Sequence, residues 1–112
     1  MDGKQAMQPF ELVIEPLDGG VVRETWIDEG LVTFGRAPDN QVVLDDRTIS
    51  GRHGVLRARA NVLVVEDCDS TNGVRVNGER VFRKTLFSGD VIKIGTHNIH
   101  VRVGSRNPRG FL

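Results

Sequence analysis

Short runs of apolar residues, separated by polar turn residues, recur along most of the chain. Toward its C-terminal end, Ile99, Val101 and Val103 alternate with His100 and Arg102, which gives a strand one apolar face and one polar face. Turn-forming Gly, Pro, Asn and Asp return about every eight to twelve positions, and no stretch has the period of an amphipathic helix. The pattern predicts an all-β protein.

The expected strands are short, and turn signals separate them. They span residues 10–15, 21–27, 31–35, 42–44, 54–59, 62–67, 74–76, 91–95 and 98–103. Asn-Gly pairs at 72–73 and 77–78 flank one of them, and Asn-Gly is the strongest short hairpin signal. We expect an antiparallel β-sandwich of about ten to eleven short strands, with its binding loops at one end.

The chain of 112 residues is long enough to bury a core without disulfides, and its single cysteine, Cys68, excludes an internal one. We expect a flexible N-terminal segment over residues 1–9, one domain over 10–103 and a flexible C-terminal tail over 104–112. The first nine residues lack the apolar centre of a signal peptide, and no apolar run approaches the roughly 20 residues that span a bilayer. A soluble, cytoplasmic domain is the expectation.

The charge balance bears on possible partners. Fifteen Lys and Arg residues match fifteen Asp and Glu residues, so the formal net charge is zero. Such a chain lacks the broad basic field that drives non-specific binding to nucleic acids or membrane surfaces, and neither is expected as a partner. Any anion site must therefore be local.

Polar residues with binding chemistry concentrate between the strands, and none is a strong general base beside an obvious nucleophile. They form the groups Gly35-Arg36, Ser50-Gly51-Arg52-His53 and Asp67-Cys68-Asp69-Ser70-Thr71-Asn72-Gly73. Together they supply a guanidinium, hydroxyls, an amide and glycine-marked turns that expose backbone N–H groups. This set suits the capture of a phosphate group, which offers three strong acceptor oxygens and a charge of about −1.5 to −2 at neutral pH.

The order and spacing of these groups resemble the forkhead-associated (FHA) domain, a phosphothreonine-peptide binding module, from about Leu31 to Val103. The resemblance implies that Arg36, Ser50 and Thr71 contact the phosphate and that Asn72 contacts the peptide backbone. We add Gly51 and Arg52 as candidate phosphate contacts. The resemblance also implies that Gly35, His53 and Gly73 hold the loops in shape, and we expect Asp67 and Ser70 to stabilise their own loop.

One departure from the family pattern concerns the position directly after the serine. Many members carry a polar or basic side chain there that reaches the ligand, whereas this chain has Gly51. The Gly51 N–H can still donate, and Arg52 is a candidate substitute. Thr48 stands where the family often reads the peptide residue three positions after the phosphothreonine.

The resemblance implies a non-catalytic module that binds a phosphothreonine-containing protein in Ser/Thr kinase signalling. We expect no cofactor, no metal and a monomer. An alternative from the same fold stays open, namely a phosphate-independent docking domain that recognises proteins through a sheet face or through the loops. A charge-inverting change at Arg36 separates the two hypotheses.

An enzyme is the first hypothesis from another class. Ser50, His53 and Asp67 could be imagined as a triad, because triads are defined by geometry and not by order. The chain has no Gly-x-Ser-x-Gly elbow and no phosphate-binding Gly-x-x-x-x-Gly-Lys loop, which disfavours catalysis.

The second hypothesis from another class is metal binding through His97 and His100, with Cys68 or His53. In a strand, residues three apart point to opposite faces, so His97 and His100 are poorly placed to chelate together. We expect both to face solvent around a turn.

Overall fold

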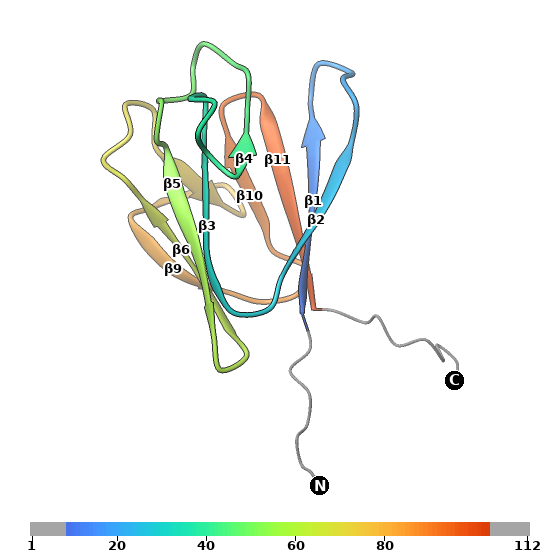
Figure 1. Cartoon of the computed structure of the whole chain (residues 1–112). Coiled ribbons are helices and arrows are strands. Elements are labelled where there is room, and N and C mark those ends of the chain that lie inside the picture. Colours follow the sequence, from blue (N-terminus) through green and yellow to red (C-terminus); the bar gives the residue numbers. More distant parts are fainter. Residues whose placement is uncertain (1–8, 104–112) are drawn as a thin grey trace, which may run out of the picture.

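The computed structural model describes residues 9–103, and its eleven elements over that range are all β-strands in two sheets (Figure 1). The six-stranded sheet contains, in order, β2 (Arg23–Ile27), β1 (Phe10–Pro16), β11 (His97–Val103), β10 (Val91–Ile94), β7 (Val74–Val76) and β8 (Glu79–Val81). The five-stranded sheet contains, in order, β4 (Val42–Val43), β3 (Gly30–Gly35), β5 (Gly54–Arg59), β6 (Val62–Asp67) and β9 (Arg83–Leu86). No helix that could cross a membrane occurs in this part of the chain.

The predicted all-β sandwich is confirmed. The two sheets pack face to face, and their inner faces form one apolar core. Leu12 and Ile14 of β1 alternate with half-buried neighbours, and Leu56 of β5 and Leu63 of β6 are fully buried in the opposite sheet. The expected flexible segments over residues 1–9 and 104–112 lie outside the described residues, apart from Pro9.

Three features of the strands differ from the sequence predictions. The pair β3–β4 is parallel, with Phe34 opposite Val42 and Gly35 opposite Val43. The loop over residues 36–41 brings the chain back to the level of Phe34, so that β4 then runs in the same direction as β3. The strand expected from residue 21 begins at Arg23. Strands β8 and β9 were not predicted, since each closes one edge of its sheet and buries too few side chains to show an apolar pattern.

The two histidines of β11 lie on opposite faces of the strand, as expected for residues three apart. His100 faces outward and its Nε2 lies 2.8 Å from Glu15 Oε1. His97, which we expected to face solvent, is only 7% exposed, because it shares the inward face with Ile99 and Val101. Its Nδ1 atom has no hydrogen-bond partner among the described residues.

Three loops emerge at the same end of the five-stranded sheet (Figure 1). Phe34 near the end of β3 pairs with Gly54 at the start of β5, and Gly54 pairs with Asp67 at the end of β6. The loops over residues 36–41, 44–53 and 68–73 therefore begin or end at neighbouring points, and we call them the first, second and third loops. The turn at Ala60-Asn61, with φ of 52° and 64°, lies at the opposite end.

We expect Leu56→Ala to destabilise the domain by about 2–5 kcal/mol, because Leu56 is fully buried and its removal leaves a cavity between the sheets. Urea unfolding followed by tryptophan fluorescence measures the change. Val21→Ala, at a residue 80% exposed, is the control and should shift stability by less than about 0.5 kcal/mol. Equal unfolding midpoints for the two variants would contradict this assignment of the core.

Candidate functional site

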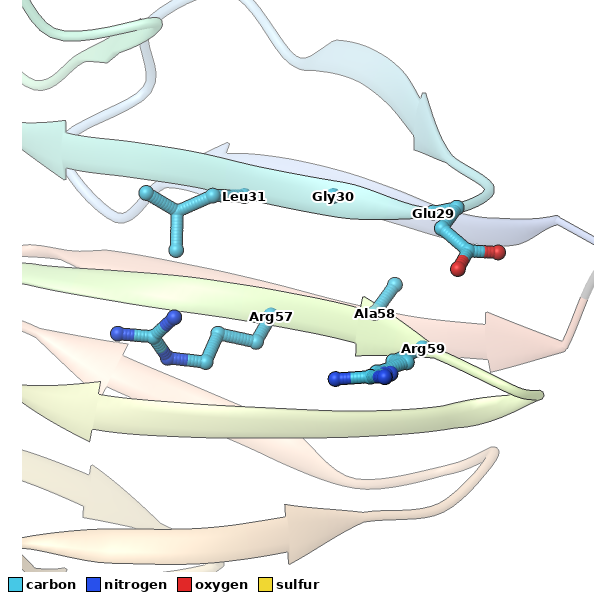
Figure 2. Close-up of a pocket in the computed structure, with 6 residues that line it drawn as sticks. All are labelled: Glu29, Gly30, Leu31, Arg57, Ala58 and Arg59. Carbon is cyan, nitrogen blue, oxygen red and sulfur yellow. The ribbon is translucent and has the colours of Figure 1, made fainter.

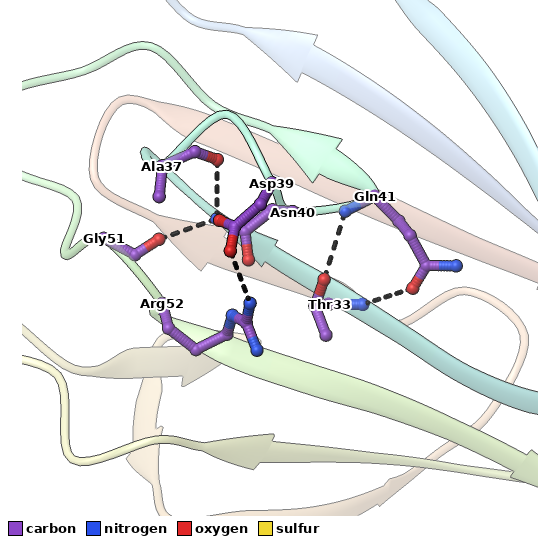
Figure 3. A network of polar contacts seen from close by, with 7 residues as sticks. All are labelled: Thr33, Ala37, Asp39, Asn40, Gln41, Gly51 and Arg52. Atoms are coloured by element: carbon purple, nitrogen blue, oxygen red, sulfur yellow. Dashed lines mark hydrogen bonds and ion pairs between the residues drawn. The ribbon is translucent and has the colours of Figure 1, made fainter.

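Backbone hydrogen bonds join the first and second loops. The Arg36 N–H donates to the Ser50 carbonyl and the Ala37 N–H donates to the Gly51 carbonyl, each at 3.0 Å. The side chain of Asn40 donates from Nδ2 to the carbonyls of Ala37 and Gly51, at 2.9 and 2.6 Å (Figure 3). These contacts place Arg36 directly beside Ser50.

Asn40 is a site residue that sequence reasoning missed. It is 6% exposed, and its amide fixes the spacing between the two loops. Next to it, Thr33 and Gln41 exchange two hydrogen bonds of 3.1 Å, which fasten the end of the first loop to β3 (Figure 3). The only sequence signal for Asn40 was a turn-forming Asn after Pro38-Asp39, which is also typical of an ordinary turn.

Gly35 allows the close approach of the two loops. A Cβ added there would overlap the Gly51 carbonyl oxygen and lie 2.8 Å from the His53 nitrogen and 2.9 Å from Asn40 Nδ2. Two of these three atoms belong to the backbone and cannot move aside cheaply. Gly35 is therefore required by packing at the root of the site.

The buried side chain of His53 connects the second and third loops. Its Nδ1 accepts the Ser50 N–H at 3.1 Å, and its Nε2 donates to the Gly73 carbonyl at 2.8 Å. These partners define the neutral imidazole with its hydrogen on Nε2. The ring also stacks against Phe34, with centroids 6.3 Å apart, so its orientation is fixed.

The third loop is organised by its own side chains. Asp67 Oδ1 accepts the Ser70 N–H, and Ser70 Oγ accepts the Gly73 N–H, both at 3.0 Å. Gly73 has a φ of 86°, which an L side chain rarely adopts. The structure thus places Asp67, Ser70 and Gly73 within the framework of the loop.

Ser50 and Thr71 are brought together from different loops. The Thr71 N–H donates to Ser50 Oγ at 3.1 Å, which leaves the hydroxyl hydrogen of Ser50 free to donate outward. Thr71 is one of the expected phosphate contacts, and both its N–H and its hydroxyl are possible donors. The structure commits the N–H to Ser50 instead, while the exposed hydroxyl bonds to none of residues 9–103.

The two candidate arginines differ in whether their guanidinium groups have a partner. The exposed guanidinium of Arg36 forms no hydrogen bond or ion pair within residues 9–103. Arg52 Nη2 lies 3.5 Å from Asp39 Oδ2, in a pair whose side chains are 47% and 76% exposed (Figure 3). Exposed pairs of this kind contribute little, so an anionic ligand can replace Asp39.

The backbone of the second loop adds neutral donors. The N–H groups of Gly51 and Arg52 donate to no group in the described part of the chain, and both residues are exposed. They lie directly after Ser50, beside the Arg36 backbone. The site therefore combines free guanidinium, hydroxyl and backbone donors.

Asn72 is tied to the second loop on one side only. Its Nδ2 donates to the Thr48 carbonyl at 2.8 Å, and its exposed Oδ1 accepts no hydrogen bond from residues 9–103. An amide held in this way can accept a backbone N–H from a bound peptide.

Asp46 fastens the second loop to the turn between β10 and β11. Its Oδ1 accepts the N–H and hydroxyl of Thr48, each at 2.8 Å, and its Oδ2 accepts the N–H and hydroxyl of Thr96. The hydrogen bonds from Thr96, followed by those from Thr48, hold the pKa of Asp46 well below its ordinary value of 3.8. Asp46 is a structural residue that sequence reasoning also missed.

The geometry gives no support to the imagined triad. Ser50 meets His53 through its backbone N–H and not through its hydroxyl, and both ring nitrogens already have partners. Asp67 bonds to Ser70 rather than to the imidazole. Within the described ranges, no group of three or more His, Cys, Asp or Glu residues could hold a metal ion.

A separate hollow of about 420 Å³ lies at the opposite end of the five-stranded sheet (Figure 2). Glu29, Gly30, Leu31, Arg57, Ala58 and Arg59 line it. Its Arg57 is paired with Glu66 at 3.0 Å, and none of its lining residues belongs to the three loops. It is not part of the candidate site.

This all-β sandwich brings donor groups together on three hydrogen-bonded loops at one end. That arrangement defines the class of modules that bind ligands through their loops. A family model for the FHA domain matches residues 32–95 of the chain, which therefore belongs to the FHA family. Glycogen accumulation regulator GarA of Mycobacterium tuberculosis is 36% identical over 80 residues, which cover 71% of this chain and 49% of GarA. The chain thus spans about half the length of this curated relative.

Two solved structures are similar over most of the chain. One, from a structural and functional analysis of phosphothreonine-dependent FHA domain interactions, is 35% identical with a TM-score of 0.78, covering 87% of this chain and 98% of that one. The other is the FhaA FHA domain in complex with the intracellular domain of Rv3910, 36% identical with a TM-score of 0.75, covering 83% and 99%. The family and the regulatory name of GarA indicate a non-catalytic binding module.

We expect Asp46→Asn to lower the free energy of unfolding by about 1–2 kcal/mol at neutral pH. The variant should also lose less stability than wild type when the pH is lowered. Because the pKa of Asp46 is lowered in the folded domain, the unfolded chain takes up this proton at higher pH. The stabilisation is therefore complete above the ordinary pKa of 3.8 and is lost as the pH falls further.

Urea midpoints at pH 7 and pH 3 measure this effect. Asp45→Asn is the matched control, because the exposed Asp45 carboxylate accepts no hydrogen bond within residues 9–103. If the urea midpoint falls by the same amount between pH 7 and pH 3 for wild type and for Asp46→Asn, the role assigned to Asp46 is contradicted.

Proposed function

We propose that this domain binds proteins that carry a phosphorylated threonine, through the first, second and third loops, and that it does so without catalysis. The observation that carries the proposal is that the hydrogen bonds which hold the loops together leave other donors of the site available to a ligand. Hydrogen bonds between the loops fix Arg36, Ser50 and Thr71 side by side, while the Arg36 guanidinium and the hydroxyl hydrogens of Ser50 and Thr71 have no acceptor within residues 9–103.

Each free group has a role in the proposed complex. Arg36 supplies a guanidinium that can meet two phosphate oxygens at once, and Arg52 adds a second cation after leaving Asp39. The hydroxyls of Ser50 and Thr71 and the N–H groups of Gly51 and Arg52 supply neutral donors. Charge-assisted hydrogen bonds contribute about 1.5–3 kcal/mol each, so a few of them account for much of the affinity.

The peptide main chain is aligned by Asn72, whose Nδ2 is fixed to Thr48 and whose Oδ1 faces outward in the proposal. Gly35, Asn40 and His53 keep these groups in place without touching the ligand. The ligand is expected to be an exposed, flexible segment, whose ordering opposes binding and keeps the affinity moderate and reversible.

The similar proteins support the same class of partner. One similar structure concerns phosphothreonine-dependent interactions, and the similar FhaA domain is bound to the intracellular domain of another protein. A Ser/Thr kinase that modifies the partner, a monomeric state and a cytoplasmic location are parts of the proposal that remain predictions.

The proposal is tested by NMR titration of the ¹⁵N-labelled domain with three peptides that differ only in carrying phosphothreonine, phosphoserine or threonine. We expect amide shifts confined to Arg36, residues 50–52 and residues 71–73, and seen mainly with phosphothreonine. Shifts on a sheet face with all three peptides would instead support phosphate-independent docking.

We expect Arg36→Ala to weaken binding of the phosphothreonine peptide by about 2–5 kcal/mol, the usual cost of removing one partner from a desolvated charge pair. Isothermal titration calorimetry measures the change. Arg59→Ala is the matched control, since Arg59 is an exposed arginine at the far end of β5. A loss below about 0.5 kcal/mol for Arg36→Ala would show that this residue is not the phosphate counter-charge.

A further inference from the structure

Three basic residues form one row across neighbouring strands of the six-stranded sheet. Lys93 of β10 is directly opposite Arg75 of β7, and Arg75 is directly opposite Arg80 of β8. Directly opposite residues share a face of the sheet. The face is the outer one, because all three residues are exposed while both neighbours of Arg75 in β7 are buried.

This basic row lacks acidic partners. None of its members lies within ion-pair distance of a carboxylate in residues 9–103, and Arg75 has only a 3.4 Å contact to the Gly78 carbonyl. The other sheet differs, since Glu66 lies between Arg57 and Arg83 at 3.0 and 2.8 Å. Like charges directly opposite each other are destabilising, so the free domain gains nothing from the basic row.

The basic row lies beside the third loop. A hollow of about 170 Å³ there is lined by Asn72, Gly73, Arg75, Lys93 and Gly95. The Arg80 side chain packs on Gly73, where an added Cβ would lie 2.7 Å from Arg80 Cζ. The same loop therefore borders both the proposed phosphate site and the basic row.

We propose that the basic row binds Asp or Glu side chains of the same peptide, close in sequence to its phosphothreonine. The inference rests on the proposed function and adds the class of sequence that the site prefers. Arg75 lies two strand residues beyond Gly73, roughly 7 Å, and Lys93 lies one strand further, roughly 5 Å. An extended peptide covers this span in about two to four residues.

The test uses fluorescence anisotropy with labelled phosphothreonine peptides. One peptide has neutral flanks, one has Glu at the second to fourth positions before the phosphothreonine, and one has Glu at the same positions after it. The proteins are wild type, Arg75→Gln, Lys93→Gln and the control Arg59→Gln. Arg59 is also exposed but lies at the far end of the other sheet.

We expect wild type to bind one of the two acidic peptides about three- to tenfold more tightly than the neutral peptide, as a few exposed ion pairs allow. Arg75→Gln and Lys93→Gln should each reduce this preference and keep affinity for the neutral peptide within about twofold. Arg59→Gln should retain the preference in full. Thermal unfolding of Arg75→Gln should occur at or above the wild-type midpoint, since a repulsion is removed.

Two outcomes would overturn the inference while the proposed function stands. One is equal affinity of wild type for acidic and neutral phosphopeptides. The other is an equal loss for both peptides in Arg75→Gln with a lower unfolding midpoint, which would mark a structural role. Failure of wild type to bind any of the three phosphopeptides would instead overturn the proposed function, and the inference with it.

Discussion

The two hydrogen bonds of the buried His53 ring hold the second and third loops together, and one of them reaches a carbonyl 20 residues further along the sequence. One ring nitrogen fixes the Ser50 backbone and the other fixes the Gly73 carbonyl, so the second and third loops cannot drift apart independently. The contact between Ser50 Oγ and the Thr71 N–H depends on this spacing. A single neutral imidazole thus sets the separation of two hydroxyls that belong to different strand connections.

The site separates the groups that build it from the groups left for a ligand. Backbone carbonyls, the Asn40 Nδ2 group and the Asp46 carboxylate form hydrogen bonds inside the domain, while the guanidinium of Arg36 has no partner within residues 9–103. Rigid loops with free donors lose little conformational entropy when an anion arrives. The charge of the site is also local, as the neutral overall composition requires.

Much of this arrangement could be predicted from sequence, because a strand with one buried face shows alternating apolar and polar residues. The same alternation would have placed His97 inside with Ile99 and Val101, had the rule been applied to the histidine. The edge strands β8 and β9 gave no such signal, because they bury few side chains. The role of Asn40 and the partner of the Thr71 N–H depend on contacts between loops that local sequence does not encode.

Strands β1 and β11 pair along their full lengths, with Phe10 opposite Val103. Both ends of the sandwich therefore leave from one point, at the end of the molecule away from the three loops (Figure 1). A protein fused to either end, or a surface to which either end is anchored, would stand about 20 Å away from the loops, since seven strand residues separate the two ends of β1. The position of these ends thus suits a tethered domain, in an array or in a longer chain, whose three loops point away from the point of attachment.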